Sequence, residues 1–206
     1  WQKAAELSGE VIDAGLYSLE SDLNNVFMQG INEAIWQYPG EDVTYSESNE
    51  GYNFIPDPES SPDFEITTSL RDAFEPGDQR KVNWTNEIEV SGIPYIYPYK
   101  YKKKFLEDSD LREDYVLLRF SEQYLIRAEA RAQLDQSSEA LEDINLVRQR
   151  AGLTDLSFSD KATLLADIMQ ERRIELFAEW GNRWGDLKRT GRANTGLVES
   201  IRVEYY

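Results

Sequence analysis

Two glutamates one helical turn apart, Glu171 and Glu175, are the residues in this chain best spaced for acid–base chemistry. Paired carboxylates can act as the acid and the base in glycoside hydrolysis. Arg172 and Arg173 lie between them, however, and an arginine beside a carboxylate holds it ionised. We therefore interpret the pair as part of an ion-pair network between helices, and we do not predict an enzyme.

The chain contains no histidine and no cysteine. The absence of histidine excludes the usual general base, the serine–histidine pair and most zinc sites within this chain. The absence of cysteine excludes disulfides, thiol nucleophiles and thiolate metal sites. Four aspartates on predicted loops could offer oxygen ligands to Ca²⁺, but they lack EF-hand spacing: Asp57, Asp63, Asp108 and Asp110. We predict neither a metal site nor a cofactor.

An aromatic and polar segment over residues 36–54 has the composition of a saccharide-binding site. Sugar rings stack their C–H faces on aromatic planes, while amide and acidic side chains bind the hydroxyl groups. Each residue alone is better explained by packing within the loop, so the prediction concerns the set. The candidate ligand-binding residues are Trp36, Tyr38, Tyr45, Asn49, Tyr52, Asn53, Phe54 and, further along the chain, Trp84.

Tyrosines alternate along the chain from Tyr95 to Tyr101 and are mixed with lysines up to Lys104, a pattern that can bind single-stranded nucleic acid. The 22 basic and 39 acidic residues give a formal net charge of −17, which repels phosphate backbones and anionic lipid surfaces. The period of two instead indicates an extended segment with one tyrosine face packed on helices, and Pro98 places it at a sheet edge or outside a sheet. We predict no nucleic-acid partner.

The chain divides into zones that differ in composition and in predicted secondary structure. Residues 1–37 are predicted to form a pair of helices, Trp1–Ala14 and Asn24–Trp36, because apolar residues recur there at helical spacing. Residues 38–114 hold all seven prolines and are predicted to be mostly irregular, with one short helix at Thr67–Phe74. A loop zone this long and this aromatic is better explained by function than by disorder, so we expect the ligand there.

Residues 115–191 are predicted to form the helical core. Apolar stripes indicate helices over Tyr115–Leu134, Ser138–Ala151 and Asp160–Trp180, and the short loops between them favour antiparallel packing. Residues 192–206 are assigned to a tail.

Within this core, four residues fall at the spacing of the large and small positions of a tetratricopeptide helix pair: Tyr124, Ala128, Ala140 and Ile144. Small residues at such positions let two helices approach closely. The predicted fold class is all-α, a tetratricopeptide-like helical scaffold with a long loop-rich insertion, in a single domain over residues 1–206.

Several segments of the chain resemble the C-terminal part of SusD/RagB-type proteins, and they occur in the same order. They are Ala73–Arg80, Pro98–Tyr101, Tyr124–Ala130, Ala140–Gly152, Glu171–Leu176 and Arg183–Gly191. The resemblance implies a lipid-anchored protein on the surface of the Gram-negative outer membrane. Such a protein binds a polysaccharide or oligosaccharide, or in some members a peptide, and covers a SusC-like TonB-dependent transporter.

The lipidated cysteine, signal peptide and N-terminal helices of such proteins have no counterpart here, so the resemblance predicts a C-terminal fragment that meets the membrane only through an anchor absent from this chain. The leading hypothesis is a non-enzymatic glycan receptor that docks on a transporter. One alternative is a tetratricopeptide-like protein-interaction scaffold that binds no small ligand. The least favoured alternative is a glycoside hydrolase using two carboxylates.

Overall fold

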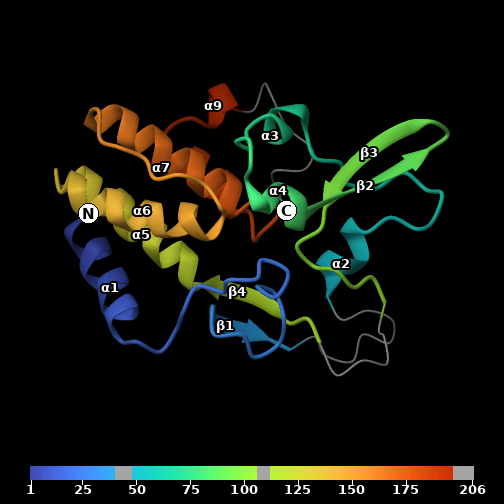
Figure 1. Ribbon diagram of the computed structural model, residues 1–206, viewed down its shortest axis with the longest axis horizontal. Coiled ribbons are helices and arrows are strands. Elements are labelled where there is room, and N and C mark those ends of the chain that lie inside the picture. The colour runs from blue at the N-terminus through green and yellow to red at the C-terminus, as the bar shows by residue number, and fades with distance from the viewer. Residues whose placement is uncertain (40–47, 106–111, 197–206) are drawn as a thin grey trace.

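The computed structural model describes residues 1–39, 48–105 and 112–196 of the chain. Four helices gather on one side of the molecule, where α5 packs against α1, α6 and α7 (Figure 1). They span Gln2–Asp13 (α1), Phe120–Gln133 (α5), Ser137–Arg150 (α6) and Lys161–Glu175 (α7). The predicted helices at these places are confirmed, although α5 begins five residues later and α7 ends five residues earlier than the apolar stripes suggested.

Small side chains at the contacts explain how α5, α6 and α7 come together. Ala128, Ala132, Ala140 and Ile144 are fully buried in one apolar cluster, together with residues of α7. Alanine at a helix contact allows the two backbones to approach closely. The cluster agrees with the spacing seen in the sequence, while its likeness to a tetratricopeptide unit stays a prediction.

Two small antiparallel sheets accompany the helices, so the fold is helix-rich and not purely α. Strand β1 (Ala34–Tyr38) pairs with β4 (Tyr115–Arg119), which occupies the start of the predicted helix Tyr115–Leu134. Strands β2 (Thr85–Val90) and β3 (Ile93–Pro98) form a hairpin. Ser91 and Gly92 connect them with φ of +54° and +79°, as a tight two-residue hairpin turn requires.

The predicted helix at Asn24–Trp36 is wrong. The Asp22 carboxylate accepts a hydrogen bond from the backbone N–H of Asn24 (2.9 Å), which closes a local turn in place of a helical one. Gly30 has a φ of +73°, and the residues after Glu33 enter the β1–β4 ladder. Side chains of this segment are buried nonetheless, so the sequence identified core residues correctly but assigned them the wrong backbone.

The middle zone contains more regular structure than was predicted. Helix α3 (Thr68–Arg71) confirms the short helix expected at Thr67–Phe74. The structure adds α2 (Asn49–Phe54) and α4 (Gln79–Trp84), each begun by a side chain that accepts a backbone N–H, from Ser48 and Asp78 respectively. Two further short helices follow α7: α8 (Asn182–Arg189) and α9 (Ala193–Gly196).

The larger apolar core joins the middle zone to the end of α7. Its buried members come from the segment before β1, from the region of α2, α3 and α4, from β4 and from the segment after α7, and include Phe27, Phe54, Leu70, Phe74, Trp84, Val116 and Phe177. Burying side chains of this size stabilises the fold by about 1.5–3 kcal/mol each. This core therefore fixes α2 and the segment that follows α7 relative to one another.

Candidate functional site

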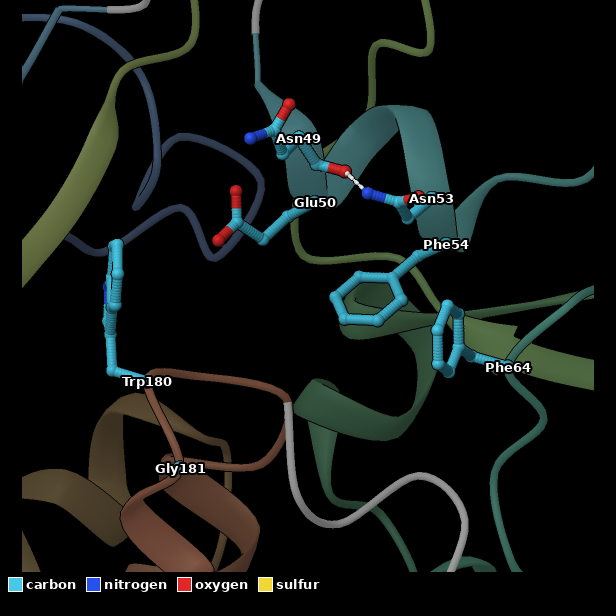
Figure 2. Close-up of a pocket in the computed structure, with 7 residues that line it drawn as sticks. All are labelled: Asn49, Glu50, Asn53, Phe54, Phe64, Trp180 and Gly181. Atoms are coloured by element: carbon cyan, nitrogen blue, oxygen red, sulfur yellow. Dashed lines mark hydrogen bonds between the residues drawn. The ribbon is translucent and has the colours of Figure 1, made fainter.

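A pocket of about 620 Å³ lies between α2 and the turn that follows α7, a size typical of small-ligand sites. Figure 2 shows side chains converging on it from both sides. The described residues that line it are Asn49, Glu50, Asn53, Phe54, Phe64, Trp180 and Gly181. The pocket therefore combines aromatic rings with amide and carboxyl groups, the combination that a saccharide requires.

Helix α2 supplies the polar side of the pocket and is held tightly in place. The Ser48 hydroxyl accepts a hydrogen bond from the backbone N–H of Gly51 (3.0 Å) and so caps the helix. The backbone N–H of Asn49 donates to the Tyr115 hydroxyl on β4. A Cβ atom at Gly51 would lie 2.0 Å from the Lys103 carbonyl oxygen, so only glycine allows this close approach.

The turn after α7 presents Trp180 to the pocket through an unusual backbone. Ala178, Trp180 and Gly181 all have a positive φ, of +55°, +42° and +70°. Such conformations are unfavourable for residues other than glycine, and they persist where the surroundings fix them. The Trp180 indole N–H donates to the Val116 carbonyl oxygen (2.7 Å), yet 54% of the residue is exposed. Much of its ring is therefore available to a ligand.

A buried network of ion pairs holds the turn after α7 in place through Glu179. Arg119 donates to both carboxylate oxygens of Glu179 (2.9 Å each), and the Lys100 ammonium donates to Glu179 as well. Because Glu179 stands between Ala178 and Trp180, these bonds hold the strained turn in register. The network thereby contributes to the orientation of Trp180.

Phe54 and Phe64 form the apolar wall opposite Trp180 (Figure 2). Their ring centroids are 5.6 Å apart and the rings are perpendicular, a favourable edge-to-face arrangement. Phe54 belongs to the buried core, so the pocket receives only the part of its ring that the core leaves uncovered.

Glu50 is the single carboxylate among the described lining residues, and its carboxyl group extends from α2 toward Trp180 (Figure 2). Its Oε2 atom is buried and has no hydrogen-bond partner among the residues that the structure describes. Burial raises the pKa of this carboxyl from 4.5 to about 7; the nearby charge of Glu179 adds to the effect and the backbone N–H of Glu50 opposes it.

Comparison with known proteins places this arrangement in a family. Residues 94–202, more than half of the chain, match the model of the SusD family. The chain belongs to the SusD family.

A SusD-like protein of Formosa agariphila is 37% identical over 103 residues, which cover 46% of this chain and 20% of that protein. The crystal structure of a SusD homolog from Bacteroides thetaiotaomicron matches with a TM-score of 0.77 at 21% identity, over 98% of this chain and 48% of that one. Surface glycan-binding protein A from Bacteroides uniformis gives 0.73 at 22% identity, over 100% and 51%. The two structures establish the SusD fold for a chain that spans about half of each of them.

The structure brings together some of the sequence-predicted residues and separates others. Asn49, Asn53 and Phe54 line the pocket, and the Asn53 amide donates to the Asn49 carbonyl oxygen (2.7 Å). Tyr52, 48% exposed, instead packs edge-to-face with Phe105. Tyr45 lies outside the described residues.

Two predicted aromatic residues lie on β1 and outside the pocket lining. Trp36 and Tyr38 are 57% and 46% exposed on this strand. They stand opposite Leu118 and Tyr115 of β4 in the strand register. Trp36 and Tyr38 therefore belong to a separate exposed surface on the β1–β4 sheet.

The assignment of Trp84 to a ligand site is wrong. This residue is fully buried, and its indole N–H donates to the Leu23 carbonyl oxygen (2.8 Å). The Lys100 ammonium lies over its ring, 4.4 Å from the centroid. A tryptophan at the end of a short helix in a polar stretch looks exposed in the sequence, but tertiary packing covers it.

The sequence did not point to Glu50, Phe64, Trp180 and Gly181 as lining residues. Trp180 continued the apolar stripe of α7 in helical spacing and was therefore assigned to the helical core. The chain leaves the helix at Leu176, and the left-handed turn then directs the ring outward. The one usable signal was Gly181, which favours a positive φ directly after an exposed aromatic residue.

The interpretation of Glu171 and Glu175 as members of an ion-pair network is confirmed. Glu175 accepts hydrogen bonds from Arg80, Arg119 and Arg150, and Glu171 accepts from Arg80 and Arg148. Although burial opposes ionisation, Arg150, Arg119 and Arg80 hold the pKa of Glu175 well below its usual range. The free acid–base pair that hydrolysis would need is therefore not formed by these two carboxylates.

Three lysines of the Tyr95–Lys104 segment are occupied by contacts within the protein. Lys100 is buried, Lys102 donates to the carbonyl oxygens of Asn83 and Tyr99, and Lys104 donates to that of Ile55. Pro98 ends β3, whose only partner in the described sheets is β2. These lysines form no open basic surface for a phosphate backbone.

Of the four aspartates considered for Ca²⁺, Asp57 pairs with the Lys104 ammonium (2.8 Å), while Asp108 and Asp110 lie outside the described residues. No group of three or more potential metal ligands occurs in the part of the chain that the structure describes. Within the same part, no helix is both long enough and apolar enough to cross a membrane.

Proposed function

We propose that this chain is the glycan-binding part of a non-enzymatic cell-surface receptor and that the pocket between α2 and the Trp180 turn holds the saccharide. The observation that carries the proposal is the pocket itself, in which the exposed Trp180 ring faces the amide and carboxyl groups of α2. Membership of the SusD family supports it. The related structure from Bacteroides uniformis, described as a surface glycan-binding protein, also supports a glycan over a peptide.

The wider biological setting belongs to the same proposal. The receptor would sit on the outer membrane through a lipid anchor and would work with a TonB-dependent transporter. The resemblance to SusD/RagB-type proteins supports both statements. The α5–α6 pair would serve as a tetratricopeptide-like scaffold that holds the pocket in place.

The proposal is tested by isothermal titration calorimetry with a panel of hexasaccharides from glucan, mannan, xylan and galactan backbones. Trp180→Ala is expected to weaken binding of the best saccharide at least about tenfold, because stacking on one aromatic ring contributes ~1–3 kcal/mol. Trp36→Ala removes an equally exposed tryptophan from outside the pocket lining and serves as the matched control. Equal losses in both variants would place the ligand elsewhere, and no binding by the unmodified chain would end the receptor proposal.

A second candidate function is a protein-interaction scaffold, which a groove of about 480 Å³ along α6 favours. Leu141, Leu146 and Leu156 contribute apolar surface to it, beside polar residues such as Asn145 and Gln149. A scaffold would keep its protein partner in Trp180→Ala, whereas a receptor would lose its sugar. Hydrolysis is less favoured, because the described lining of the pocket offers one carboxylate where two are needed.

A further inference from the structure

Glu50 differs from Glu171 and Glu175 because no positively charged side chain among the described residues bonds to it. Three arginines bond to Glu175 and two bond to Glu171. The Glu50 Oε2 atom has no such partner among the described residues, although it is buried. A buried carboxyl oxygen without a partner is costly, so the carboxylate would be stabilised by a hydrogen-bond donor that a ligand brings to its pocket-facing side.

The groups around Glu50 do not supply a compensating charge. Three titratable groups among the described residues interact electrostatically with Glu50. They are Tyr101, which follows β3, Tyr115 on β4, and Glu179 in the turn after α7. Two are tyrosines, and the third is another acid that is already bonded to Arg119 and Lys100. Ionised Glu50 therefore adds to the pocket a negative charge that none of these groups balances.

On the basis of the proposed function, we infer that Glu50 sorts saccharides by charge: its pocket-lining carboxylate accepts a hydrogen bond from a hydroxyl group of a neutral sugar and excludes a uronate at the same position. Asn49 and Asn53 on the same helix provide polar groups for the remaining hydroxyls, and Trp180 provides the stacking surface. An acidic sugar would bring its carboxylate against Glu50 without an arginine to bind it. The favoured substrate class is thus a neutral glycan.

Protonation of Glu50 weakens this selection. The pKa of Glu50 is raised to about 7, mainly by burial, so the group is ionised at pH 8 and mostly protonated at pH 5.5. A uronate ring has an ordinary carboxyl and stays ionised at both values. Discrimination against acidic sugars is therefore expected at pH 8 and should largely disappear at pH 5.5.

The test uses pairs of hexasaccharides that share a backbone and differ only in whether the sixth carbon carries a hydroxyl or a carboxylate, such as β-1,4-mannose and β-1,4-mannuronate hexamers. At pH 8 the unmodified chain should bind the neutral member at least about tenfold more tightly, because like charges a few ångströms apart in a protein site cost more than that factor. At pH 5.5 the ratio should fall to within about threefold. Glu50→Gln should show the small ratio at both pH values.

Glu10→Gln is the matched control, because it removes one exposed negative charge from α1 and should keep the ratios of the unmodified chain. A ratio that does not change with pH, or that is the same in Glu50→Gln as in the unmodified chain, would overturn the inference while the receptor proposal stands. Absence of binding to every saccharide would overturn both. The pH series needs no substitution, so it decides the question even if Glu50→Gln fails to fold.

Discussion

Two acidic side chains of the molecule, Glu175 and Glu50, have opposite electrostatic environments. Beneath the turn after α7, Glu175 is surrounded by Arg80, Arg119 and Arg150, and its pKa lies well below the usual range. In the pocket, Glu50 keeps one oxygen without a partner among the described residues, and its pKa is raised to about 7. The protein itself balances the charge of Glu175 with three arginines, whereas the described residues leave one oxygen of Glu50 without a hydrogen-bond donor.

This difference indicates that the acids of α7 have a structural role, whereas Glu50 has a role in binding. The charged stripe along α7 is the part of the sequence that looks most like an active site, yet its acids are used to hold helices and strands together. The network reaches the function only indirectly, through Glu179, which fixes the turn that presents Trp180. We therefore assign Glu175, whose charge arginines balance, to the scaffold, and Glu50, which has no such partner among the described residues, to the binding surface.

The largest effect should come from breaking the network. Glu175→Ala leaves three buried arginines without a shared partner, which should lower the free energy of unfolding by about 3–5 kcal/mol. Urea unfolding followed by circular dichroism measures this, with the exposed Glu10→Ala as a control expected to stay within ~0.5 kcal/mol. A loss below about 1 kcal/mol for Glu175→Ala would show that the network is not a structural element.

A smaller effect is expected where the pocket wall meets its support. Gly51→Ala would place a Cβ atom 2.0 Å from the Lys103 carbonyl oxygen, so α2 must shift, at a cost of about 1–3 kcal/mol in stability. Saccharide affinity should fall as well, because Asn49 and Asn53 move with the helix. Gly185→Ala on α8 is the matched control, since a Cβ there meets nothing within 4 Å. Equal stability of the two variants would contradict the close packing of α2.

The free energy of unfolding should depend on pH through Glu50. Because the folded-state pKa of Glu50 exceeds its ordinary value of 4.5, the folded protein binds this proton more tightly than the unfolded chain does. Stability therefore falls as pH rises from about 4.5 through 7, and the full cost is present above pH 7. Glu50→Gln should be more stable than the unmodified chain by up to about 3 kcal/mol at pH 8 and equal to it near pH 4.5.

Urea unfolding at several pH values measures this difference. Carbon-13 NMR titration of the Glu50 carboxyl provides the direct value, expected at about 7. An ordinary titration near 4.5, with no stability difference at pH 8, would remove the contrast between Glu50 and Glu175.

The sequence predicted the helices whose apolar residues repeat regularly over several turns. Helices α1, α5, α6 and α7 have this pattern, and α5, α6 and α7 also pack against one another as neighbours in the sequence. The β1–β4 pairing joins residues about 80 positions apart, and no local sequence pattern identifies a strand partner at that distance. The segment before β1 was consequently assigned to a helix.

The site was predictable only in part for a related reason. Asn49, Asn53 and Phe54 were found because one segment of the sequence concentrates aromatic and amide groups. Phe64 and Trp180 come from other parts of the chain, and Trp180 reaches the pocket through a left-handed turn. Trp84 has the same side-chain chemistry as Trp180 but is fully buried, and composition alone does not distinguish the two.

The pocket between α2 and the Trp180 turn is proposed to bind a neutral saccharide. A crystal structure of the chain with its tightest-binding neutral hexasaccharide tests this most directly. We predict a sugar ring stacked on Trp180 and a hydroxyl group within hydrogen-bonding distance of the Glu50 carboxyl group. A sugar bound on the exposed β1–β4 surface around Trp36, with the pocket empty, would contradict the account.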